Sequence, residues 1–91
     1  MPKPKWYRCE PVEMARRILL EGYRSKDGRI WVSRNEPMPM YGEVCFLVTL
    51  PRGSEETYHD DEGYPVRYAF KYPGNAIPPK NFKVVIGKEL L

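Results

Sequence analysis

The sequence predicts a small α+β domain with about five mostly antiparallel strands and one main α-helix over residues 11–21. Three observations support this class. A chain of 91 residues has the length of one domain and not two. Hydrophobic residues make up 42% of the chain and charged residues 30%, a balance typical of a folded protein. Strand-like segments outnumber the single helical pattern, and one helix is too few for a doubly wound sheet.

The helix is predicted from the segment that begins at Pro11. Proline suits the first helical position because its missing N–H would be unpaired there. The carboxylates of Glu10 and Glu13 suit the positive end of the helix dipole. An apolar stripe follows at three- and four-residue steps, formed by Val12, Ala15, Ile18 and Leu19. We expect Gly22 to end the helix, since glycine readily adopts positive φ values.

Five segments rich in β-branched and aromatic residues are predicted as strands. They cover residues 5–9, 29–33, 43–50, 66–72 and 82–86. Between the second and third, the Pro37-Met38-Pro39-Met40 run resists a regular helix. Residues 52–65 are polar, acidic and poor in apolar side chains, so we expect a long surface loop there.

The net charge of +3 combines three blocks of alternating sign. Residues 1–35 carry nine basic and four acidic side chains, residues 36–62 carry one and seven, and residues 63–91 carry five and one. A nucleic-acid-binding protein usually shows one continuous basic face. Two basic blocks around an acidic one therefore identify no partner, and a solvated surface of mixed sign explains the pattern.

The sequence disfavours a membrane protein and a metal protein. The longest apolar run, Val44–Val48, is far shorter than the about 20 residues of a membrane-spanning helix. No apolar stretch follows the basic N-terminal residues, so no secretory signal is expected. Cys9 and Cys45 with the single His59 are too few for a zinc site. We expect a cytoplasmic protein with no metal and two reduced thiols, although a disulfide between them is conceivable.

Aromatic residues alternate with basic ones in the segment Arg67-Tyr68-Ala69-Phe70-Lys71-Tyr72. Such interleaving can stack nucleic-acid bases and hold phosphates. On a strand, however, the three rings point to one face and the two cations to the other, which favours core aromatics with outward cations. Nucleic-acid binding stays an alternative, through the basic residues Lys5, Arg8, Arg16, Arg17, Arg24 and Arg29.

Several motifs occur in an order that resembles a known family. Trp6-Tyr7-Arg8 is followed by a helix that ends at Glu21-Gly22, and then by Ile30-Trp31-Val32-Ser33. Glu43–Pro51 and the Ile-Pro-Pro segment Ala76–Val85 come later. Together they resemble small ADP-ribosyltransferase domains, and the match covers most of the chain.

This resemblance implies a split β-sheet whose cleft binds NAD as a substrate. Arg8 would match the first-strand arginine that contacts the phosphates or ribose of NAD, as suits a guanidinium fork. Ser33 would steady the nicotinamide ribose, and Tyr41 would lie under the nicotinamide ring. Glu62, with Asp60 two residues before it, would be the acid that stabilises the oxocarbenium-like transition state. Arg8 and Glu62 would be the catalytic residues, and ADP-ribose would pass to a macromolecule, for example a protein.

Other interpretations stay open. Without the resemblance, Arg8 would simply pair with Glu10 or Glu43, Ser33 would end a strand and Tyr41 would cap the core. The chain would then be a non-catalytic protein-binding module, such as an inhibitor or regulator from a mobile element. Its charge blocks would favour fast, oriented encounter with a complementary protein. A nucleic-acid-binding domain is the second alternative.

Overall fold

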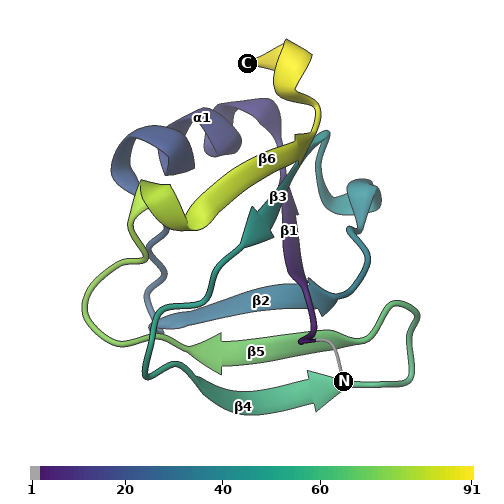
Figure 1. Cartoon of the computed structure of the whole chain (residues 1–91), viewed down its shortest axis with the longest axis vertical. Coiled ribbons are helices and arrows are strands. Elements are labelled where there is room, and N and C mark those ends of the chain that lie inside the picture. Colours follow the sequence, from purple (N-terminus) through teal and green to yellow (C-terminus); the bar gives the residue numbers. More distant parts are fainter. Residues whose placement is uncertain (1–2) are drawn as a thin grey trace.

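One α-helix and six β-strands make up the part of the chain that the computed structural model describes, residues 3–91 (Figure 1). The helix α1 spans Val12–Glu21. The strands are β1 (Trp6–Glu10), β2 (Arg29–Arg34), β3 (Val44–Val48), β4 (Glu55–Asp60), β5 (Arg67–Lys71) and β6 (Phe82–Ile86). Short 3₁₀ turns cover Pro39–Tyr41, Pro79–Asn81 and Lys88–Leu90. This arrangement confirms the predicted small α+β class.

The six strands form one antiparallel sheet in the order β4-β5-β2-β1-β3-β6. Its central junction is short. β1 pairs with β2 only through Trp6–Arg34 and Tyr7–Ser33, whereas β1 with β3, and β2 with β5, each share five residue pairs. Beyond Tyr7 and Ser33 the two central strands therefore diverge, and the sheet is split there. Figure 1 shows β2, β5 and β4 stacked along one side of the molecule, with α1 beside β3 and β6 on the other.

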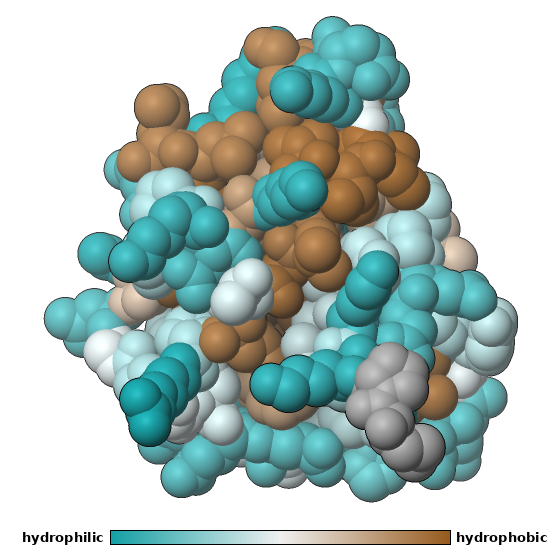
Figure 2. Space-filling view, viewed as in Figure 1, coloured by the Kyte–Doolittle hydropathy of each residue, from teal (hydrophilic) through white to brown (hydrophobic). Residues whose placement is uncertain are grey.

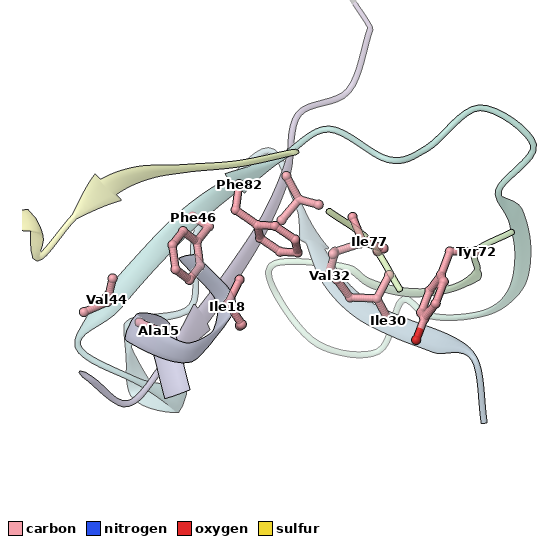
Figure 3. Close-up of a cluster of buried hydrophobic side chains, with 10 residues drawn as sticks. Ala15, Ile18, Ile30, Val32, Val44, Phe46, Tyr72, Ile77 and Phe82 are labelled. Atoms are coloured by element: carbon pink, nitrogen blue, oxygen red, sulfur yellow. The ribbon is translucent and has the colours of Figure 1, made fainter. Parts of the chain in front are cut away.

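The hydrophobic core lies on one face of the sheet, where α1 contributes to it. Ala15 and Ile18 of the helix are buried together with alternate residues of the strands. Figure 3 shows Ala15 and Ile18 of the helix in the same part of the cluster as Val44 and Phe46, while Ile30, Val32 and Tyr72 form the other part. Leu19, predicted for the same stripe, is only half-buried at its edge.

Strand β4 lies inside the segment for which the sequence predicted a long loop. It is an edge strand that pairs with β5 alone, and most of its side chains are exposed. An edge strand with two solvated faces needs no alternation of apolar residues, so the usual sequence signal is missing. Its register shifts at Thr57, whose hydroxyl donates to the carbonyl of Ala69 over 3.1 Å.

The expectation of two reduced thiols was wrong, because Cys9 and Cys45 form a disulfide. The two cysteines face each other in the register of β1 and β3. Their separation of 36 residues gave no hint of this contact, since it depends on which strands become neighbours.

Removing this bridge is expected to lower the free energy of unfolding by about 2–4 kcal/mol, because the cross-link closes a long loop and restricts the unfolded chain. Urea denaturation of the Cys9→Ala/Cys45→Ala double variant against the oxidised protein measures the effect. Adding a dithiol reductant to the wild type should shift its midpoint in the same direction and leave the double variant unchanged. Equal midpoints for oxidised protein and variant would contradict the prediction.

The surface is unevenly polar. Figure 2 shows a mostly hydrophilic surface where β4 and β5 lie, and apolar atoms gathered around β6 and the C-terminal end. The exposed apolar residues of that end are Val85, Ile86, Leu90 and Leu91. Within residues 3–91, no helix has both the length and the apolar character needed to cross a bilayer.

Candidate functional site

A cavity of about 290 Å³ opens where β1 and β2 diverge. We call it the split pocket. It is lined by Tyr7, Arg8, Cys9, Glu10, Trp31, Val32, Ser33, Met38, Tyr41 and Arg67. The volume is near the lower end of the range for small-molecule sites. Past Tyr7 and Ser33 the facing edges of β1 and β2 do not pair with each other.

The structure brings three of the predicted site residues, Arg8, Ser33 and Tyr41, to this one cavity. Arg8 comes from β1, Ser33 from β2, and Tyr41 from the 3₁₀ turn between β2 and β3. Glu62, the predicted catalytic acid, is not among the lining residues. It is exposed in the segment between β4 and β5, where its N–H donates to the Asp60 carboxylate over 3.1 Å.

Arg8 is held in the split by several contacts. Its Nε donates to Glu10 Oε2 over 2.7 Å, and Nη1 donates to the Trp31 carbonyl over 2.9 Å, which bridges the gap between the two strands. The guanidinium carbon lies 4.8 Å from the centre of the Tyr23 ring. Within residues 3–91 these contacts occupy two of the five N–H donors of the guanidinium, so the others can bind an anion.

Glu10 was predicted to lie at the helix N-terminus, but it is the last residue of β1 and turns back to Arg8. It is 8% exposed and lines the split pocket. A buried carboxylate needs such a partner, because desolvation of an unpaired charge is costly. Glu10 is therefore a buried, ion-paired carboxylate in the lining of the pocket.

Ser33 and Tyr41 are already engaged in hydrogen bonds. The Ser33 hydroxyl donates to the Glu36 carbonyl over 2.5 Å, so toward a ligand it can only accept. Tyr41 is 55% exposed, and its hydroxyl accepts from Arg67 Nη1 over 3.0 Å. The turn that carries Tyr41 is set directly on β1, since a Cβ at Gly42 would overlap the main chain of Glu10.

Arg67 connects the pocket to β4. Its Nη2 donates to Asp60 Oδ2 over 2.5 Å while Nη1 binds Tyr41. The hydrogen bond from Arg67, followed by that from the Glu62 N–H, holds the pKa of the Asp60 carboxyl below its ordinary value. Asp60, which the resemblance paired with Glu62, therefore contacts Arg67, a residue that lines the split pocket.

A second cavity of about 520 Å³ shares Arg8 and Glu10 with the split pocket. It lies against α1, with Arg17, Glu21 and Arg24 at its border. Tyr23 also lines it, and burial raises the pKa of that phenol above its ordinary value, while the nearby Arg8 opposes the shift. The Arg8–Glu10 pair thus stands between two cavities.

Among the pocket residues that the sequence interpretation did not assign to a site are Glu10, Trp31 and Arg67. Glu10 was assigned to the helix end, and the other two come from separate strands that only the sheet order joins. Among residues 3–91, no group of three or more His, Cys, Asp or Glu side chains is arranged to hold a metal ion.

No protein-family model, curated protein or solved structure matches the chain. The function of the split pocket must therefore be inferred from its own geometry and from the sequence resemblance.

Proposed function

We propose that the split pocket binds NAD and that the chain is a minimal ADP-ribosyltransferase-like protein. One observation supports this most: Arg8, Ser33 and Tyr41, which lie far apart in the sequence, border a single cavity at the split of the sheet. The resemblance assigned these three residues to one ligand. A guanidinium with free N–H donors suits the pyrophosphate, and the exposed face of Tyr41 suits a flat nicotinamide ring.

The charges of the pocket also fit this ligand. Arg8 and Glu10 place a cation and a carboxylate 2.7 Å apart at the cavity wall. NAD carries both signs, with an anionic pyrophosphate and a cationic nicotinamide ring. Phosphate would compete for Arg8, and the Glu10 carboxylate would then face the positive end of the ligand. In a site for a purely anionic nucleotide, a buried carboxylate would repel the ligand.

The reaction would break the bond between the ribose C1′ and the nicotinamide nitrogen. Nicotinamide leaves with the bonding electrons, and the sugar passes through an oxocarbenium-like state. A nucleophile of the acceptor macromolecule then bonds to C1′ and loses its proton. A carboxylate near C1′ stabilises the positive transition state electrostatically. In the split pocket that carboxylate is Glu10, so we assign the role to Glu10 in place of Glu62.

The binding claim is tested by titrating the protein with NAD up to millimolar concentration and following amide chemical shifts. We expect shifts at residues of the split pocket. Arg8→Ala should weaken binding by about 10- to 100-fold, the value of a charge-assisted hydrogen bond. Arg34→Ala is the matched control, because Arg34 lies on β2 outside the pocket. The absence of shifts, or equal affinity for wild type and Arg8→Ala, would rule out the site.

The catalytic claim is tested by measuring nicotinamide release. Glu10→Gln should slow release at saturating NAD, whereas Glu62→Gln should not, because Glu62 does not line the pocket. If Glu62→Gln slows release and Glu10→Gln does not, the catalytic acid is Glu62 and not Glu10. If NAD binds and no variant or wild type releases nicotinamide with any acceptor, the chain is a binding domain without transferase activity.

A further inference from the structure

A pair of exposed aromatic rings lies on the face of the sheet opposite the core. Trp31 of β2 is 41% exposed and Tyr58 of β4 is 59% exposed. Their ring centres are 5.6 Å apart and their planes meet edge to face at 67°. Both residues stand opposite Ala69 of β5, one on each side, and Ala69 itself is buried. The small alanine lets the two rings meet above the sheet.

Basic side chains surround this pair. Arg67 and Lys71 lie two residues before and after Ala69 on β5, so they project to the same face. Arg29 stands opposite Lys71 on the neighbouring strand. Within β5, the aromatic residues point to one face of the sheet and Arg67 and Lys71 to the other. The rings on the face of Arg67 and Lys71 come from the neighbouring strands β2 and β4.

Two acidic residues moderate the charge of this face. Asp60 binds Arg67, and Glu55 stands opposite Lys71 in the register. Three cations thus face two anions in the register of the strands, and the Asp27 carboxylate, which accepts from the Arg29 N–H over 3.1 Å, adds a third negative charge near Arg29. Attraction for an anionic polymer would come mainly from stacking on the rings, with a small electrostatic contribution.

We propose that this face binds single-stranded nucleic acid, through bases stacked on Trp31 and Tyr58 and phosphates near Arg29 and Lys71. An exposed ring on a sheet, flanked by cations, offers a stacking surface for any unpaired base. A duplex keeps its bases stacked on each other and cannot use the rings. Trp31 and Arg67 border both this face and the proposed NAD site, whereas Tyr58, Lys71 and Arg29 do not line the split pocket.

The test is fluorescence polarisation with labelled 12-nucleotide DNA and RNA single strands of mixed sequence, without NAD. Tyr58→Ala should weaken binding by about tenfold, as the loss of one stacked base predicts. Tyr58→Phe, which keeps the ring, should bind like the wild type. Tyr64→Ala is the control, because Tyr64 is an exposed tyrosine outside this face. Lys71→Ala should reduce the slope of log affinity against log salt by about 0.7, the value of one phosphate contact on a single strand.

Three results would overturn the proposal: no binding at low salt, equal affinity for a duplex of the same sequence, or equal affinity for wild type and Tyr58→Ala. Binding of a polyglutamate peptide in place of the strands would assign the face to an acidic protein segment. Circular dichroism checks that each variant is folded. Quenching of tryptophan fluorescence by unlabelled strand, lost in Trp31→Phe, gives a second readout in an otherwise wild-type chain. Arg8→Ala should bind the strands normally, so failure of the NAD site leaves this result intact.

Discussion

Gly22→Ala is expected to lower the free energy of unfolding by about 2–6 kcal/mol. Gly22 follows α1 with a φ of +86° and a ψ of −177°, a conformation that residues with a side chain rarely adopt. The backbone strain costs about 1–3 kcal/mol. In addition, a Cβ at this position would overlap the carbonyl oxygen of Ile77, and crowding of this kind costs about 1–3 kcal/mol more. Urea denaturation measures the loss.

The overlap has a structural consequence, because Ile77 is tied to the residue after Gly22. Tyr23 and Ile77 exchange two main-chain hydrogen bonds of 2.8 Å each. Moving the segment around Ile77 away from a new Cβ would lengthen both hydrogen bonds. Gly28→Ala separates the two effects, since Gly28 also has a positive φ, of +70°, but open space around the new atom. Equal losses for the two variants would show that the close approach at Gly22 contributes nothing.

Ile18→Ala is expected to lower the free energy of unfolding by about 2–5 kcal/mol, because it leaves a cavity between α1 and the sheet. Ile18 is 1% exposed and belongs to the main cluster of buried side chains. For a domain of about 5–15 kcal/mol total stability, this loss is large. The midpoint of urea unfolding provides the measurement.

Two neighbours on the same helix serve as controls for Ile18. Leu20 is 82% exposed, so Leu20→Ala should change stability by no more than about 0.5 kcal/mol. Leu19 is half-buried, so its loss should fall between the two. A cost below about 1 kcal/mol for Ile18→Ala would mean that the helix does not close the core as described.

The fold was predictable wherever local patterns determine the structure. The stripe from Val12 to Leu19 and the proline and glycine at the helix ends specify α1, although Pro11 is the cap and not the first helical residue. Apolar and aromatic runs specify five of the strands. Strand β4 could not be predicted this way, since Glu55–Asp60 is polar throughout and its pairing depends on a partner distant in the sequence.

The candidate site was only partly predictable, for a related reason. Arg8, Ser33 and Tyr41 were found through a resemblance of motif order, and strand order brings them together. The pairing of Arg8 with Glu10 was one of the alternatives that the sequence offered, but a place for Glu10 in the pocket depends on where β1 and β2 diverge. The Cys9–Cys45 bridge and the Trp31–Tyr58 pair likewise exist only through register. Contacts that depend on the pairing of strands distant in the sequence leave no local pattern from which they could be predicted.

The short junction of β1 and β2 has a consequence for how the ligand preference of this protein can evolve. Past Tyr7 and Ser33, the facing edges of both strands offer main-chain donors and acceptors to whatever occupies the gap. Every residue type except proline keeps both groups, so most substitutions leave them in place. Replacement of the surrounding side chains can therefore change which ligand the split pocket prefers, while the main-chain groups continue to offer hydrogen bonds to polar ligands.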